Sequence, residues 1–197
     1  MLGKLIYLLF IIINNKMSKE IAEMIGSDQF SKMLGPGVKI LKYSDLEKYF
    51  NINQVIPESK GYRIILIETK QSTGHWTTLI KYNPKSFEWF DSYGLAPDQE
   101  FSFISPEMQQ ILDEKRHILS ILLDKLVSEG GSYTWNKMKL QQMKPGVNTC
   151  GRWVCGRVYF FQRGYDLKQF QQYFVNWKKQ SGLSYDTLVC EFTKNLD

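Results

Sequence analysis

Cys150 is the residue whose type and position point most clearly to chemistry. It stands in "NTCGRW", between a polar turn and an amphipathic stretch that predicts a helix. A thiol in the first turn of a helix lies near unpaired backbone N–H groups, which stabilise the thiolate and lower the thiol pKa. Gly151 follows directly, and its lack of a side chain lets a substrate carbonyl approach the sulfur and the N–H donors. We therefore interpret Cys150 as a candidate nucleophile.

Other roles for Cys150 compete with catalysis. The chain has 3 cysteines, which are Cys150, Cys155 and Cys190. The spacing of Cys150 and Cys155 matches no structural zinc pattern, and at that spacing on a helix the two side chains do not satisfy disulfide geometry. A packed, unreactive cysteine stays open as the alternative on these residues alone. The odd, sparse set of cysteines favours a reducing compartment.

A cysteine nucleophile needs a base, and the sequence has 2 histidines. His117 ends the charged run "DEKRH", where no catalytic role is expected. His75 opens a predicted strand and precedes Trp76, which can shield the imidazole from water, so we choose His75 as the base. Asp91, at the end of a neighbouring predicted strand, is the candidate group that orients the histidine. A turn-forming role before "SYG" is the alternative for Asp91.

The strands that must position these residues are short runs rich in β-branched and aromatic side chains, at 62–69, 75–82 and 86–93. The turn "NPKS" between the last two predicts a hairpin, which places His75 and Asp91 at the same end.

Helices are predicted on both sides of these strands. Their ranges are 18–34, closed by "GPG"; 43–50, with Ser44 as N-cap; 106–129, with Ser105 as N-cap and Pro106 at the first position; 150–163; and a last long helix that Asp166 and Gln169 cap. A further strand is predicted in 133–143. The fold class that follows is α+β, a small mixed sheet with flanking helices.

The formal net charge of +5 is unevenly distributed. Residues 130–180 contain nine Lys or Arg and one acid, Asp166, and so carry +8, while the rest of the chain carries −3. The nine are Lys137, Lys139, Lys144, Arg152, Arg157, Arg163, Lys168, Lys178 and Lys179. Such a region favours an anionic partner such as nucleic acid, and a solvated face is the alternative.

The N-terminal residues 1–16 form an apolar tail whose role stays open. Its run "LIYLLFIII" at 5–13 is shorter than the roughly 20 residues that a membrane-spanning helix needs. No small-residue cleavage site follows it, which argues against a signal peptide, and Met17 is an alternative start to Met1. With 43% hydrophobic and 23% charged residues the chain is not of the disordered or fibrous type, and 17–197 is predicted to be one domain.

Four short motifs follow one another along the chain and supply His, Asp, Gln and Cys in that order: "GHW", "FDSYG", "LQQ" and "NTCGRW". Together, over residues 62–164, they resemble the adenain and Ulp1 type of cysteine peptidase, and most of all the maturation proteases of virophages, Polinton-type elements and large DNA viruses. The resemblance implies a papain-like or adenain-like core, with Cys150 as nucleophile, His75 as base and Asp91 as orienting acid. It also implies an oxyanion-hole glutamine, for which we prefer Gln141 and keep Gln142 as the alternative.

The resemblance implies a thiol endopeptidase that cleaves capsid or other precursor proteins after small residues, with Trp76 and Gly151 next to the substrate. It implies no required cofactor and no metal, with DNA as a non-specific activator bound through residues 130–180. The expected location is the virion and the host-cell cytoplasm or virus factory. Three alternatives stay open: processing of ubiquitin-like proteins, an acyltransferase of the same clan, and a non-enzymatic DNA- or capsid-binding module.

Overall fold

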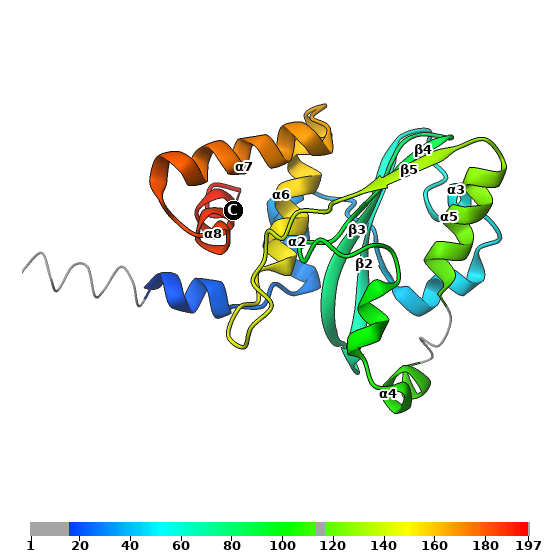
Figure 1. The fold of residues 1–197 in the computed structure, drawn as a ribbon, viewed down its shortest axis with the longest axis horizontal. Helices are drawn as coiled ribbons and strands as arrows, with labels where there is room; N and C mark the ends of the chain where they lie inside the picture. The colour runs from blue at the N-terminus through cyan, green and yellow to red at the C-terminus, as the bar shows by residue number, and fades with distance from the viewer. Residues whose placement is uncertain (1–15, 113–116, 197) are drawn as a thin grey trace, which may run out of the picture.

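A five-stranded mixed sheet forms the centre of the computed structural model, which describes residues 16–112 and 117–196 (Figure 1). The strands lie in chain order: β1 Ile40–Lys42, β2 Gly61–Lys70, β3 Thr73–Asn83, β4 Ser86–Phe90 and β5 Ser132–Trp135. β2, β3 and β4 are antiparallel, whereas β1 and β5 add to the two edges in parallel. The predicted α+β class, with a small mixed sheet and flanking helices, is confirmed.

The central hairpin follows the sequence pattern closely. Asn83 pairs with Ser86 across the predicted "NPKS" turn. The strand predicted over 133–143 is wrong beyond Trp135, because the side-chain amide of Asn136 donates to the carbonyl oxygens of Asp91 and Met138 and turns the chain away from the sheet. β1 was not predicted.

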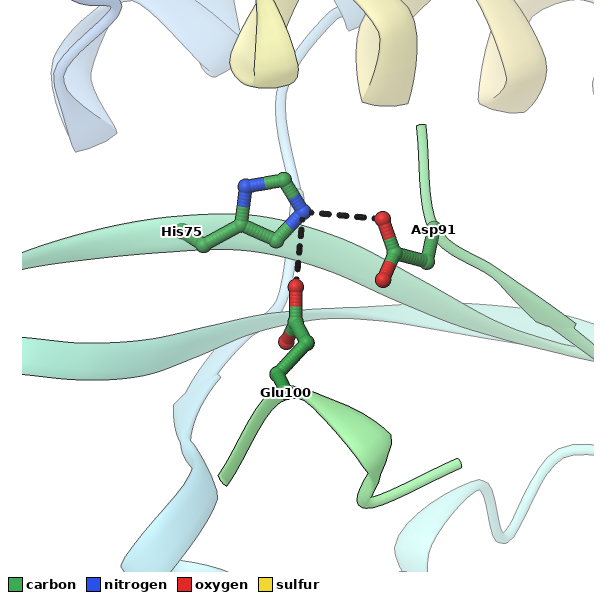
Figure 2. A group of neighbouring side chains, drawn as sticks. All are labelled: His75, Asp91 and Glu100. Carbon is green, nitrogen blue, oxygen red and sulfur yellow. Dashed lines mark hydrogen bonds and ion pairs between the residues drawn. The ribbon is translucent and has the colours of Figure 1, made fainter. Parts of the chain in front are cut away.

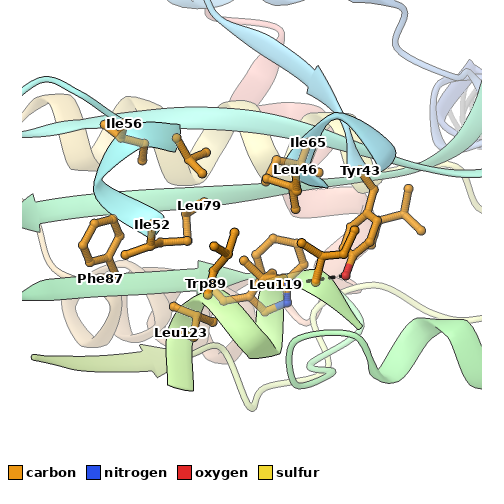
Figure 3. Packing of buried hydrophobic residues seen from close by; sticks show 14 of the residues in the cluster. Tyr43, Leu46, Ile52, Ile56, Ile65, Leu79, Phe87, Trp89, Leu119 and Leu123 are labelled. Atoms are coloured by element: carbon orange, nitrogen blue, oxygen red, sulfur yellow. Dashed lines mark hydrogen bonds between the residues drawn. The ribbon is translucent and has the colours of Figure 1, made fainter. Parts of the chain in front are cut away.

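One face of the sheet is covered by η1 (Tyr43–Lys48), α3 (Ile52–Val55) and α5 (Ile118–Ser128). Figure 3 shows the packing of this cluster, in which Trp89 of β4 lies among side chains of the covering helices. The sheet residues that join it are Ile65, Ile67, Leu79, Phe87 and Trp89. Burying a side chain of this size stabilises the fold by about 1.5–3 kcal/mol, so this layer holds β2, β3 and β4 in place.

The opposite face is covered by α2 (Ser27–Leu34) and α6 (Cys150–Gln162), with α7 (Leu167–Ser181) and α8 (Tyr185–Thr193) outside α6. Trp153 of α6 is buried between the sheet and the last two helices. The predicted helix over 150–163 is confirmed, and so is the capping box of Asp166 and Gln169.

The helix predicted over 18–34 is wrong as a single element. A helix over 16–22 and the separate α2 take its place, because Ile25 enters the core and Gly26 begins the new helix, its N–H donating to Gln29 at 2.8 Å. The short helix predicted over 43–50 is the 3₁₀ helix η1, and its N-cap is Lys42 rather than Ser44.

The helix predicted over 106–129 is also divided. Ser105 caps α4 (Pro106–Ile111) as expected, its Oγ accepting from the N–H of Met108 at 3.3 Å. α4 ends at Ile111 and α5 begins after His117, so the apolar residues between Ser105 and Gly130 do not share one face.

The predicted N-terminal tail lies outside the described residues, except for Lys16. Within 16–112 and 117–196, we find no helix that has both the length and the apolar character needed to cross a membrane.

Candidate active site

Three elements bring together the predicted catalytic residues. His75 is near the start of β3, Asp91 directly follows β4, and Cys150 is the first residue of α6. Nε2 of His75 lies 3.0 Å from Oδ1 of Asp91 (Figure 2), and His75 and Cys150 line the same cavity. Because Nε2 faces Asp91, Nδ1 is the ring nitrogen left for the thiol.

The environment of Cys150 favours the thiolate. Burial raises the pKa of the Cys150 thiol, but the hydrogen bond and charge of His75 and the backbone N–H groups of Trp76 and Gly151 outweigh burial, so the pKa is lowered. The other two cysteines, Cys155 and Cys190, are buried, and burial raises the pKa of Cys190 to about 12. Cys150 is therefore the thiol prepared to react.

His75 is enclosed by charge and by an aromatic ring. Burial lowers its pKa, but the neighbouring carboxyl groups of Glu100 and Asp91 and the proximity of Cys150 raise the pKa well above its usual value. The ring of Tyr93 stacks on the imidazole, with centroids 4.4 Å apart and an interplanar angle of 15°. Tyr93 belongs to "FDSYG", and no role was predicted for it.

Glu100 is the site residue that sequence analysis missed. Its Oε1 lies 3.0 Å from Nε2 of His75, so two buried carboxyl groups face one ring nitrogen (Figure 2). Glu100 belongs to η2 (Gln99–Phe103), in a segment without strand or helix periodicity. An acidic residue directly before the apolar run "FSF" was the one available signal.

A cavity of about 270 Å³ opens beside Cys150 and contains the preferred oxyanion residue. Gln141 lines it and is 4% exposed; its Oε1 accepts from Ser92 at 2.7 Å and its Nε2 donates to the carbonyl of Val147 at 3.2 Å. Gln142 is exposed and is not among the residues that line this cavity. The geometry thus brings Gln141, and not Gln142, to the thiol.

Trp76 and Gly151 contact the protein's own N-terminal segment. The indole N–H of Trp76 donates to the carbonyl of Ile25 at 2.9 Å. A Cβ at Gly151 would meet Cβ of Ile25 at 2.8 Å, so the glycine is required by the packing of Ile25. The expectation that Gly151 lies next to the substrate stays a prediction. Trp76 lines a second groove that Cys150 also lines.

The loop before the nucleophile is anchored from both ends of the chain. Thr149 donates to Asp186 of α8 at 2.6 Å, and Asp186 also accepts from the N–H of Gln142. On the other side, the amide side chain of Asn148 donates to the carbonyl of Ala22 at 2.7 Å. These contacts orient the first turn of α6, and the sequence alone did not reveal them.

His75, Asp91 and Glu100 are also the one group in the described part of the chain whose ligand atoms are suitably spaced for a metal ion, all within 4.8 Å. The same atoms contact one another at 3.0 Å around Nε2. A metal ion would have to replace the contacts that orient His75 toward Cys150.

The predicted basic surface is smaller than its residues suggested. Arg152 and Arg157 are 5% and 0% exposed, and each pairs with an acid: Arg152 with Glu23 at 2.8 Å and Arg157 with Glu88 at 2.7 Å. The expectation that both present charge to solvent is wrong, because α6 is buried on all sides over most of its length. The exposed basic set is Lys137, Lys139, Lys144, Arg163, Lys168, Lys178 and Lys179.

Comparison with known proteins gives one clear relative. No protein-family model matches the sequence. The chain is 30% identical over 162 residues to the uncharacterized protein V9 of the Sputnik virophage, covering 82% of this chain and 89% of that protein.

Two solved structures show partial similarity. The crystal structure of an ASFV protease matches with a TM-score of 0.45 and 12% identity over 76% of this chain, which spans 62% of the protease's length. The central domain of an uncharacterized Legionella pneumophila protein matches with a TM-score of 0.38 and 15% identity, over 88% of this chain and 98% of that domain. At these TM-scores, the chemistry of the site must be inferred from its own geometry.

Proposed function

We propose that this chain, which belongs to the same family as the Sputnik virophage protein V9, is a cysteine endopeptidase that cleaves viral precursor proteins. The observation that carries the proposal is that Cys150 and His75 line one cavity, where His75 lowers the pKa of the thiol, while Nε2 of His75 lies 3.0 Å from the buried carboxylate of Asp91. A cysteine, a base and a group that orients the base are the three parts of an activated thiol nucleophile.

The proposed reaction proceeds through an acyl-enzyme. Sγ of Cys150 attacks the scissile carbonyl carbon, and His75, which has taken the thiol proton, delivers that proton to the leaving amine. Water then attacks the thioester with His75 as base, which releases the carboxylate product and restores the thiol. Gln141 lines the same cavity, and a side-chain N–H donor there would stabilise the oxyanion.

The openings around Cys150 suit an extended peptide. One cavity lies on the side of Gln141, and a second groove lies on the side of Trp76. Gly74, Asn148 and Cys150 line both openings. An extended peptide could therefore pass from one opening to the other, between Gly74 and Asn148 and past the sulfur of Cys150. We propose capsid precursors as substrates because the relative is a virophage protein, and the virion or the host cytoplasm as the place of action.

The test is incubation of the protein with a peptide library, followed by mass spectrometry of the products. We expect new carboxyl termini after small residues with the wild type, and no cleavage with Cys150→Ala. Cys155→Ala and Cys190→Ala should retain most activity, because both thiols are buried and neither lines the cavity that His75 and Cys150 share. Products that carry an added amine or hydroxyl compound instead of a free carboxylate would identify an acyltransferase.

A second pair of variants tests the base. His75→Ala should reduce kcat/KM by about 10³-fold or more, and Asp91→Asn should reduce it less, because orientation matters less than the thiol–imidazole pair itself. His117→Ala is the matched control, since His117 is an exposed N-cap residue of α5. A folded but inactive His117 variant would show that the base is wrongly assigned.

A further inference from the structure

Two buried carboxyl groups face the same nitrogen of His75, although one suffices to orient an imidazole. Oδ1 of Asp91 and Oε1 of Glu100 each lie 3.0 Å from Nε2, which carries a single hydrogen (Figure 2). Asp91 makes the hydrogen bond with this nitrogen, and its Oδ1 also accepts from the N–H of Tyr93 at 2.7 Å. Glu100 must therefore serve another purpose.

The second oxygen of each carboxyl group lacks a hydrogen-bond donor. Oδ2 of Asp91 and Oε2 of Glu100 are buried, and no N–H or hydroxyl group in the described part of the chain donates to either. One oxygen of each carboxyl group lies within 4.8 Å of the other, so rotation of the side chains would bring the two groups within reach of a mutual hydrogen bond. Two carboxylates repel, so such a bond requires a proton on one of them.

The net charge of the site also favours a proton on one of the two carboxyl groups. With Cys150 as thiolate and His75 as imidazolium, two ionised carboxylates would leave a net charge of about −2 in a buried site. The described residues that line the adjoining cavity include no lysine or arginine. Burial, against the opposing charge of His75 and together with the charge of Asp91, raises the pKa of Glu100 well above its usual value.

The backbone holds Glu100 in this position at a conformational cost. Asp98, just before η2, has a φ of 65°, which is unfavourable for a residue other than glycine. Its carboxylate accepts from Tyr43 Oη at 2.6 Å and from the N–H of Ser120 at 2.7 Å, and Tyr43 in turn accepts from the N–H of Leu119. A strained turn secured by this buried network directs Glu100 inward, as strained residues near functional sites commonly do.

We propose that Glu100 is a positioning residue that carries a proton in the resting enzyme and, as a neutral acid hydrogen-bonded to Asp91, holds Asp91 against His75. The proposal deepens the proposed endopeptidase function and rests on it for its kinetic consequence. The groups that face Glu100 are His75 of β3, Asp91 after β4, Tyr93 and Cys150 of α6. Asp91 then stays ionised and stabilises the imidazolium of His75, while Glu100 adds no second negative charge to the buried site.

Infrared spectroscopy at neutral pH tests the proton directly and needs no peptidase activity. We expect a carbonyl stretching band of a protonated carboxyl group in the wild type that disappears in Glu100→Gln and persists in Cys150→Ala. Identical spectra of the wild type and Glu100→Gln in this region would overturn the proposal, because Glu100 would then be ionised. A wild type that shows the band but cleaves no peptide would refute the endopeptidase function alone.

Kinetics test the positioning role. Glu100→Ala should lower kcat by about 10- to 100-fold with little change in KM, because His75 loses its fixed orientation while the substrate grooves persist. Glu100→Gln should recover most of this loss, since its amide is neutral and can donate to Asp91 as the acid does. An equal loss in both variants, each folded by thermal unfolding, would mean that Glu100 acts through its charge, which would overturn the proposal.

Discussion

The buried ion pair of Arg157 and Glu88 ties the nucleophile helix α6 to the sheet, and breaking it should be costly. Nε and Nη2 of Arg157 lie 2.7 and 2.9 Å from the two carboxylate oxygens of Glu88, and both side chains are 0% exposed. Tyr82 adds hydrogen bonds to both partners. Arg157→Met removes the one basic partner that Glu88 has among the described residues and leaves a buried carboxylate, which typically costs about 3–5 kcal/mol.

Guanidinium-induced unfolding followed by circular dichroism measures this loss. The double variant Arg157→Met, Glu88→Met removes both charges, and its free energy of unfolding should return to within about 2 kcal/mol of the wild type. Arg163→Met is the control near the end of the same helix: the exposed guanidinium lies over the Tyr159 ring, so its removal should cost about 1 kcal/mol or less. A loss below about 1 kcal/mol for Arg157→Met, or a double variant as unstable as the single one, would refute this reasoning.

Three further outcomes are expected. Gln141→Ala should reduce kcat by about 10²- to 10³-fold, the usual cost of one oxyanion donor, while Gln142→Ala should not; the reverse result in a peptidase assay would move the donor role to Gln142. Gly74→Ala should destabilise by at least about 3 kcal/mol in denaturant unfolding, because its Cβ would lie 1.9 Å from the carbonyl oxygen of Ile67, whereas Gly156→Ala, with its nearest contact at 3.7 Å, should be neutral or stabilising. Random duplex DNA should bind the exposed basic set and raise peptidase activity, with an affinity that falls at least about tenfold between about 50 and about 200 mM salt; fluorescence anisotropy without binding at low salt would leave those lysines as a solvated face.

Local signals predicted the central elements well. Alternating aromatic residues and the "NPKS" turn define the β3–β4 hairpin, and its register alone places His75 and Asp91 at one end. Caps were equally informative, because Ser105 and Asp166 begin helices through contacts within a few residues. These features depend on neighbours in the sequence, which is why they could be predicted.

The sequence predictions failed where residues far apart in the chain determine the position of a side chain. Glu100 reaches His75 only because Asp98 adopts a positive φ, which Tyr43 and the backbone of α5 stabilise, and no periodic pattern encodes that turn. Arg157 looked solvent-exposed because an arginine on an amphipathic helix usually is. It is internal because Glu88 of β4 and the packed α7 and α8 leave α6 almost no solvent face.

The double anchoring of the loop before Cys150 has a consequence for the order of folding. His75 lies on β3 and Asp91 directly follows β4. These strands pair with sequence neighbours, and such local contacts form early. The loop that presents Cys150, in contrast, is secured by Ala22 across 126 residues and by Asp186 near the end of the described chain. We expect the thiol to gain its reactive geometry only after both distant segments have docked, so that a partly synthesised or partly folded chain has a base but no activated nucleophile.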